Sequence, residues 1–235
     1  SVVGQYSEAT QADVSAAIES ARNSLTDWSS RCVTERAAIL ERAAELFEAR
    51  TTEFTSLIAK EAGRTLNDGL DEVREAVDFC RYYAAQATSL MLSELELPGV
   101  TGETNRLSYA PRGPWLCISP WNFPLAIFTG QIVANLAVGN TVVAKPAEQT
   151  PLVARLACDV LEEAGVPEGV INLVNGDGPT LGGWLLPDER IAGVSFTGSH
   201  PSALVINRQL ALRDGPIIPF IAETGGINCM VVDST

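Results

Sequence analysis

A chain of 235 residues, 46% of them hydrophobic, is long enough to bury a sizeable core and has the composition of a globular protein. Its formal net charge of −13, from 29 acidic and 16 basic residues, excludes the Lys/Arg-rich face that nucleic-acid binding requires. No apolar run is long enough to span a membrane, and the first residues lack an export signal. We therefore expect a cytoplasmic protein with neither nucleic acid nor a membrane as a partner.

The first part of the chain is predicted to be helical. Apolar residues spaced three and four apart predict a helix over residues 11–28, a second from about 34 that ends near Gly63, and a third over 66–95 with a solvated charged face. Residues 1–97 thus form an N-terminal helical part. Residues 98–113 are rich in Gly, Pro, Thr and Asn and predict a connector, with a short extended piece at 106–110.

Short runs of Val and Ile alternate with helical segments from residue 114 to 235. The predicted strands are 115–119, 141–144, 170–174, 193–197, 217–222 and 229–232. The predicted helices are 125–136, 151–164, 180–186 and 201–212. Apolar strands separated by helices are typical of a parallel sheet covered on both faces. The predicted fold class is therefore α/β, with N-terminal helices followed by a Rossmann-like doubly wound parallel sheet.

Ligands of such sheets bind beyond the carboxyl ends of the strands, and the first of these loops holds an unusual amide. Asn122 lies between Pro120 and Pro124, and each proline restricts the backbone around it. A preorganised amide of this kind suits an oxygen that becomes negative during a reaction. The alternative is a turn in which Asn122 satisfies nearby backbone groups.

The loop after the second strand carries Lys145 and Glu148, and it leads into a helix with Thr150 as the expected N-cap and Pro151 at the first position. A carboxylate can accept hydrogen bonds from the two hydroxyls of a ribose, and a lysine can donate to them. Glu148 would repel a 2′-phosphate, which favours NAD over NADP. The alternative is an exposed ion pair at the start of a helix.

Two later loops carry further candidates. Gly198 and Ser199 end a strand before a helix, and a helix N-terminus suits a pyrophosphate. The full GxGxxG spacing is missing, and the alternative is a glycine that only forms a turn. Glu223 ends an apolar run before two glycines, which suits a general base at a buried strand end. The alternative is an acid that neighbouring backbone N–H groups satisfy.

The cysteines and the histidine of the sequence point away from a metal centre. The five cysteines are widely spaced without a CxxC pair, which indicates reduced and mostly buried thiols. The single histidine, His200, cannot support a zinc site. No metal is therefore expected.

Five motifs now stand in order: ISPWNFPL, VVAKPAEQTP, GVPEGVINLVNGDGP, VSFTGS and ETGG. Together they resemble the NAD(P)-dependent aldehyde dehydrogenase superfamily across essentially the whole chain. The segments EVREAVDFCRYYA, GPIIPFIAETGGIN and MVVDST are most similar to the L-glutamate γ-semialdehyde (pyrroline-5-carboxylate) dehydrogenase module of bacterial bifunctional proline-utilisation enzymes. The resemblance implies NAD-dependent oxidation of L-glutamate γ-semialdehyde to L-glutamate. It also implies a homo-oligomer with subunit contacts through the connector, and possible fusion to a proline dehydrogenase domain.

The resemblance assigns roles by position. Asn122 would donate to the oxyanion, and Glu223 would be the general base that activates water. Residues 1–97 would belong to the cofactor-binding domain, and residues 114–235 would be its Rossmann-like NAD-binding part. Glu75 and Phe123 would lie near the substrate. The cofactor-binding residues would be Ser119, Pro120, Trp121, Lys145, Glu148, Gly178, Gly182, Phe196, Gly198, Ser199, Thr224 and Gly225.

The sequence departs from the family pattern in two places. His200 and Pro201 follow Ser199 where a Thr-Glu type pair is more usual. The nucleophilic cysteine of the family lies beyond the ETGG motif, whereas Cys229 follows that motif closely and is expected to pack in a strand. We therefore expect the N-terminal half of a longer enzyme, truncated before the catalytic domain and inactive alone. The alternatives are a dehydrogenase for another aliphatic semialdehyde and a non-catalytic binding module of aldehyde dehydrogenase-like fold.

Overall fold

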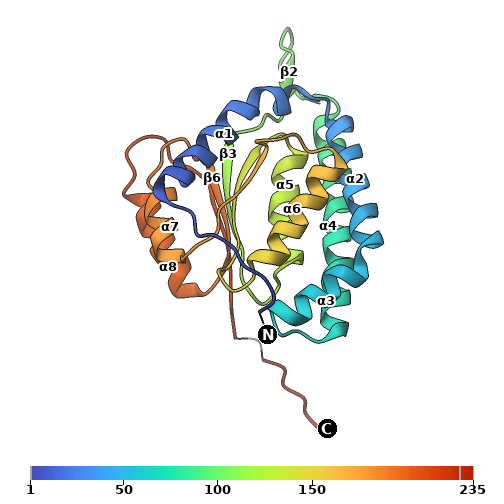
Figure 1. The fold of residues 1–235 in the computed structure, drawn as a ribbon. Coiled ribbons are helices and arrows are strands. Elements are labelled where there is room, and N and C mark those ends of the chain that lie inside the picture. Colours follow the sequence, from blue (N-terminus) through green and yellow to red (C-terminus); the bar gives the residue numbers. More distant parts are fainter. Residues whose placement is uncertain (1, 228, 235) are drawn as a thin grey trace.

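A parallel sheet of five strands lies between two layers of helices in the computed structural model, which describes residues 2–227 and 229–234 (Figure 1). The helices are α1 (Gln11–Ser30), α2 (Val33–Ala49), α3 (Thr51–Glu61), α4 (Leu66–Met91), α5 (Ala126–Ala137), α6 (Pro151–Ala164), α7 (Gly178–Leu185) and α8 (His200–Ala211). The strands of the sheet are β3 (Pro114–Ile118), β4 (Thr141–Lys145), β5 (Ile171–Leu173), β6 (Gly193–Gly198) and β7 (Phe220–Thr224). The predicted α/β fold class is confirmed.

The order of the strands places a crevice at the centre of the sheet. The order is β5-β4-β3-β6-β7, so the chain builds outward from β3 in one direction and then returns to add β6 and β7 on the other side. Trp115 pairs with Val142 of β4 and with Gly193 of β6, so β3 is the middle strand. Ligands bind in doubly wound sheets at such a reversal. The carboxyl ends of β3 and β6 are therefore the first place to look for a site.

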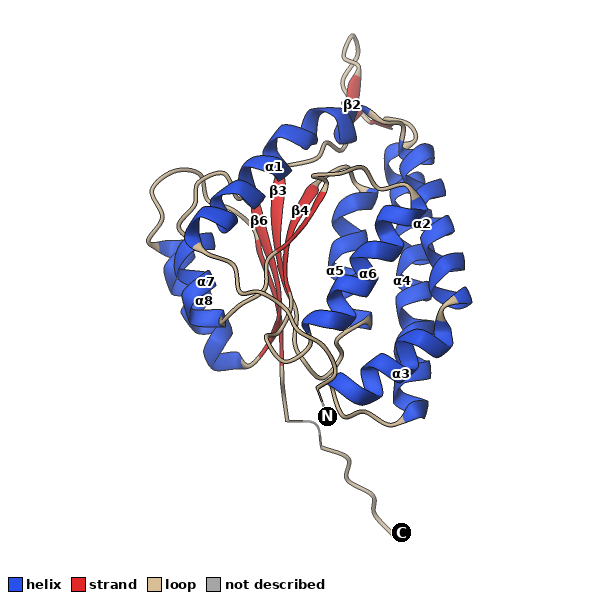
Figure 2. Cartoon of the chain, viewed as in Figure 1, coloured by secondary structure: helices blue, strands red, loops and turns tan. Residues whose placement is uncertain are grey.

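The alternation of side chains along the central strands divides the core into two parts. Trp115 and Cys117 pack among α2 to α6, whereas Leu116 between them packs on the opposite face among α1, α7 and α8. Figure 2 shows the same layers, with α5 and α6 against one face of the sheet and α2 and α4 outside them. Both faces of the sheet are thus covered, which is why its strands are continuously apolar.

The predicted second helix is in fact two helices, α2 and α3. Arg50 leaves the helical region with φ −100° and ψ 17°, so the chain changes direction there. The bend brings the rings of Phe47 and Phe54 to 5.3 Å, and both side chains are fully buried. The expected single helix was wrong because tertiary packing of these two rings overrides a continuous helical pattern.

The end of the chain also differs from the prediction. The apolar run at 217–222 forms a strand only from Phe220, because Pro216 and Pro219 cannot donate to a neighbouring strand. The predicted strand at 229–232 is wrong: its residues form no strand, and Met230 is 89% exposed. Within the described residues, no partner strand lies beside this segment, and β7 is the edge of the sheet.

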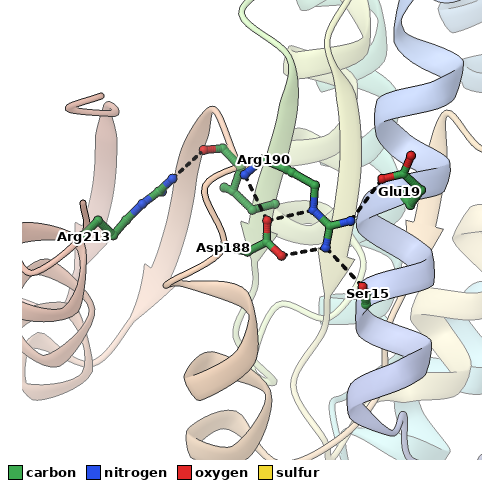
Figure 3. A network of polar contacts seen from close by, with 6 residues as sticks. Ser15, Glu19, Asp188, Arg190 and Arg213 are labelled. Atoms are coloured by element: carbon green, nitrogen blue, oxygen red, sulfur yellow. Dashed lines mark hydrogen bonds and ion pairs between the residues drawn. The ribbon is translucent and has the colours of Figure 1, made fainter. Parts of the chain in front are cut away.

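A network of polar contacts joins the first helix to the opposite end of the chain (Figure 3). Arg190 donates to Asp188 at 2.7 and 2.9 Å, and reaches Glu19 at 3.1 Å and Ser15 at 3.2 Å on α1. The hydrogen bonds from Arg190 hold the pKa of Asp188 below its ordinary value despite burial. The network fixes α1 across its face of the sheet.

The connector forms a small antiparallel hairpin of β1 (Leu95–Leu97) and β2 (Asn105–Leu107) that projects from the body of the molecule (Figure 1). The third predicted helix is α4, and it ends at Met91, before the hairpin, rather than at 95.

Among the described residues, no helix combines the length and the apolar character needed to cross a membrane.

Candidate functional site

A cleft of about 1020 Å³ lies at the carboxyl ends of β3, β4, β6 and β7. This is the reversal point of the strand order, and the volume suits a ligand of cofactor size. The predicted site residues that line it are Ser119, Pro120, Trp121, Asn122, Phe123, Lys145, Glu148, Phe196, Gly198, Ser199, Glu223, Thr224 and Gly225. Four loops that are far apart in the sequence thus meet in one cavity.

Asn122 is half-buried in the loop between β3 and α5, and it lines the cleft. The guanidinium of Arg64, between α3 and α4, donates to its main-chain carbonyl. In the described part of the chain, no hydrogen bond engages the side-chain amide of Asn122. The amide is therefore available as a donor to a ligand, while the backbone that carries it is fixed.

Lys145 and Glu148 form an ion pair at the end of β4. The side chain of Lys145 is buried, and its Nζ lies 3.4 Å from Oε2 of Glu148 and 3.0 Å from the carbonyl oxygen of Pro146. Burial lowers the pKa of Lys145, and Glu148 opposes that effect. Burial also acts to raise the pKa of Glu148, but hydrogen bonds and the charge of Lys145 outweigh it, so this pKa is lowered. A carboxylate and a cation thus stand together at the cleft wall.

Helices α5 and α6 begin beside the cleft, but protein carboxylates already occupy their N-termini. Glu61 accepts hydrogen bonds from the backbone N–H groups of Leu152 (2.8 Å) and Val153 (2.9 Å) at the start of α6. Glu72, which is 1% exposed, accepts from those of Leu125 (3.0 Å) and Ala126 (3.4 Å). An anionic ligand therefore has no access to these two helix dipoles.

Thr150 stands at the N-cap position of α6 and Pro151 is its first residue, as predicted. The expected capping by the Thr150 side chain was wrong, because its hydroxyl makes no cap hydrogen bond and is buried without a partner among the described residues. Glu61, which is 91 and 92 residues from the two N–H groups it accepts from, caps the helix instead. The long-range carboxylate satisfies two N–H groups where the local hydroxyl would satisfy one.

Helix α8 begins at the open cleft. Its N-cap is Ser199, whose hydroxyl accepts from the N–H of Ser202 at 3.2 Å. Just before it, a β-carbon at Gly198 would come within 2.7 Å of the Phe196 ring, so glycine at position 198 leaves room for that ring at the cleft wall. No protein carboxylate in the described residues occupies this helix start, but Pro201 has no N–H and the N–H of Ser202 is engaged by Ser199, so a phosphate group there would meet the helix dipole and the N–H of His200 only.

Ser119 provides a further sign that a polar ligand belongs in the cleft. Its side chain is 5% exposed, and its hydroxyl has no hydrogen-bond partner among the described residues. A buried hydroxyl without a partner costs free energy unless a ligand or water satisfies it. With the ion pair of Lys145 and Glu148 and the N-terminus of α8, the cleft presents both donors and acceptors to a polar ligand.

Glu223 lies on β7, in register with Thr197 of β6, and faces the cleft. The expectation of a buried strand end was wrong, because β7 is an edge strand and Glu223 is exposed in the described chain. The side chain therefore stands in the open mouth of the cleft. It is followed by Gly225 and Gly226, where an added β-carbon would meet no atom within 4 Å.

Three predicted residues do not line the cleft. A β-carbon at Gly178 would lie 4.0 Å from Nζ of Lys145, so Gly178 is adjacent to the site, and Gly182 lies one turn further along α7. Glu75 is exposed on α4, one turn before Phe79, which does line the cleft. Partial desolvation by its neighbours and the charge of Asp78 raise the pKa of Glu75. The roles of these three residues stay predictions.

Gln131 of α5 lines the cleft and was not predicted from the sequence. Its Nε2 donates to the carbonyl of Ile118 at 3.2 Å and to the hydroxyl of Thr197 at 3.1 Å, so it ties the ends of β3 and β6 together at the cleft floor. A lone long amide inside the apolar helix sequence AIFTGQIVANLA was the signal that could have found it. Phe79 and Tyr83, spaced four apart on α4, form an aromatic wall that was also missed.

Among the described residues, no cysteine lines the cleft, and no group of His, Cys, Asp or Glu side chains could hold a metal ion. Cys80, Cys117 and Cys158 are buried and unpaired, and burial raises their pKa values, to about 12 for Cys80 and Cys158. Such thiols stay protonated at neutral pH and are poor nucleophiles. Cys32 and Cys229 are exposed outside the cleft.

Comparison with known proteins places these features in a family. The model of the aldehyde dehydrogenase family matches residues 1–235. The chain is 49% identical to the bifunctional protein PutA of Escherichia coli K12 over 237 residues, covering all of this chain and 17% of that protein. It is 39% identical to 1-pyrroline-5-carboxylate dehydrogenase 2 of Bacillus subtilis, covering 99% of this chain and 45% of that protein. A crystal structure of proline utilization A from Bradyrhizobium japonicum matches 94% of this chain and 23% of that one with a TM-score of 0.91 and 53% identity.

Proposed function

This chain belongs to the aldehyde dehydrogenase family, and from that premise we propose that it is the cofactor-binding part of an enzyme that oxidises L-glutamate γ-semialdehyde to L-glutamate with NAD. The chain spans less than half the length of the curated relatives it matches. The activity therefore belongs to a longer protein that contains these residues. The observation that carries the proposal is the meeting of Asn122, Glu223 and the pair Lys145–Glu148 in one cleft at the strand reversal.

The reaction has two demands that these residues meet. Attack of a thiolate on the aldehyde carbon turns the carbonyl oxygen into an oxyanion, to which the Asn122 amide donates a hydrogen bond. Loss of a hydride from this adduct then converts it into a thioester. Hydrolysis of the thioester requires a base that takes a proton from water, and the Glu223 carboxylate at the cleft mouth serves as that base. The thiolate comes from a cysteine outside these residues, because the cleft lining contains none of the five cysteines of this chain.

NAD fits the cleft by the groups that face it. When bound, NAD accepts the hydride that leaves the substrate carbon. Glu148 accepts hydrogen bonds from the ribose hydroxyls and Lys145 donates to them, while the start of α8 at Ser199 receives the pyrophosphate. Ser119, whose buried hydroxyl has no partner in the described chain, donates to the cofactor near Pro120 and Trp121. Phe196, Thr224 and Gly225 complete the cofactor wall.

The rest of the assignment follows from the relatives. The names of the relatives concern proline utilization and 1-pyrroline-5-carboxylate, which supports the semialdehyde of glutamate as the substrate. We further propose a homo-oligomer with contacts through the β1–β2 hairpin, possible fusion to a proline dehydrogenase domain, and a cytoplasmic location.

A substrate panel on the full-length protein tests the proposal. L-Glutamate γ-semialdehyde and succinate semialdehyde are compared by the initial rate of NADH formation, with NAD and NADP as alternative acceptors. We expect the highest kcat/KM with glutamate semialdehyde and NAD, and no NADH from the isolated 235-residue chain. A strong preference for succinate semialdehyde would favour the alternative of another aliphatic semialdehyde dehydrogenase. No oxidation of either aldehyde by the full-length protein would favour a non-catalytic binding module.

A further inference from the structure

The segment that carries Asn122 is anchored by a residue with no assigned role. Arg64 lies in the short loop between α3 and α4, after Gly63, whose φ of +68° turns the chain. Its Nη1 donates to the main-chain carbonyl of Asn122, and its guanidinium carbon lies 4.7 Å from the centre of the Phe123 ring. One side chain thus contacts two consecutive residues of the cleft wall.

The arginine is itself held in place. Its Nε lies 3.6 Å from Oδ2 of Asp68, whose carboxylate also closes the capping box of α4 with Thr65. The side chain of Arg64 is 21% exposed, so the contact with the Phe123 ring is largely shielded from water. The position of the guanidinium is therefore set by α4, which is a long and well-packed helix.

The other end of the same segment is anchored to the same helix. Glu72 accepts hydrogen bonds from the N–H groups of Leu125 and Ala126, immediately after Pro124. Residues 122–126 are thus held at one end by Arg64, which precedes α4, and at the other by Glu72 of α4, with a proline of fixed φ between the two anchors. Arg64 is absent from the residues that line the cleft, so it acts on a ligand only through Asn122 and Phe123.

We propose that Arg64 is a positioning residue, which fixes the Asn122 amide by binding its main-chain carbonyl and fixes the Phe123 ring by covering it. The proposal rests on the proposed function, in which Asn122 donates to the oxyanion. An oxyanion donor is effective only when it is preorganised, and a displacement of about 1 Å can lower a rate about 100-fold. Without Arg64, the amide remains present but its backbone is released on one side.

The test is a double-mutant cycle in the full-length enzyme, with Arg64→Met and Asn122→Ala. Met keeps an unbranched stem against the Phe123 ring and removes the donor and the charge. We expect Arg64→Met to lower kcat about 10- to 100-fold with KM for NAD unchanged. In the Asn122→Ala background the same substitution should lower kcat by less than about 3-fold. Arg64→Lys, which retains the charge over the ring, should fall between wild type and Arg64→Met, and it carries the test if Arg64→Met is insoluble.

The control is Arg74→Met on α4, where the arginine is exposed and pairs only with Asp71 at 3.4 Å among the described residues. It should leave kcat unchanged. Equal fold-losses for Arg64→Met with and without Asn122, or an unchanged kcat, would overturn the positioning role. If Asn122→Ala itself retained full kcat, the proposed function would fail instead, so the two failures are distinguishable.

Discussion

Replacing Lys145 by Met should weaken binding of NADH without disturbing the fold. The Lys145 side chain is 6% exposed, so a hydrogen bond from its ammonium to a ribose hydroxyl forms largely out of water. Loss of one charge-assisted hydrogen bond costs about 1.5–3 kcal/mol, which corresponds to an increase in Kd of about 10- to 150-fold. The partner left behind, Glu148, has a side chain that is 42% exposed and can be solvated, so little of this cost falls on stability.

The assay is a fluorescence titration of the full-length protein with NADH. Lys60→Met is the matched control, because Lys60 is the other of the two lysines in this sequence and is exposed on α3. Burial lowers the pKa of Lys145, so wild-type affinity should decline as the pH rises through that lowered pKa, whereas Lys145→Met should show no such decline. An unchanged Kd for Lys145→Met would refute the assignment of Lys145 to the cofactor.

Three further substitutions test other parts of the account. Glu148→Gln should raise the ratio of kcat/KM for NADP to that for NAD by about 10-fold, because a carboxylate repels a 2′-phosphate; an unchanged ratio would place the 2′-position elsewhere. Arg36 is 3% exposed and donates to the carbonyls of Ala137 (3.1 Å) and Ser29 (3.5 Å). Arg36→Met should therefore lower the free energy of unfolding by about 3 kcal/mol, because it leaves buried carbonyls without their donor. The control Arg42→Met, at an exposed position, should lower it by about 0.5 kcal/mol or less. Burial raises the pKa of Glu72 above its ordinary value of 4.5, so the stability that its protonated form contributes is present below 4.5 and is lost as the pH rises through the raised pKa. In urea unfolding, the free energy of unfolding of the wild type should therefore fall relative to that of Glu72→Gln as the pH rises through the raised pKa. The same dependence on pH for both proteins would contradict this.

The sequence predicted the parts of the site that local chemistry determines. Two prolines around Asn122 restrict one loop, and a carboxylate three residues after Lys145 marks another, so both were found from the residues themselves. The order of strands and helices followed from apolar runs and their spacing, and the meeting of the loops followed from the general geometry of parallel sheets.

The features that the sequence did not predict depend on distant contacts. The cap of α6 comes from Glu61 rather than Thr150, and the bend at Arg50 depends on the packing of Phe47 against Phe54. Gln131 gains its place at the cleft floor only when β3 and β6 lie side by side. No local pattern encodes such pairs, because each depends on residues that the fold brings together from separate elements.

The most direct test of the central claim is the kcat of Asn122→Ala in the full-length enzyme with L-glutamate γ-semialdehyde and NAD. If the cleft at the strand reversal is the oxidation site and Asn122 donates to the oxyanion, kcat should fall about 100- to 1000-fold while the Kd for NADH stays within about 2-fold of wild type. A kcat equal to that of the wild type would contradict the account.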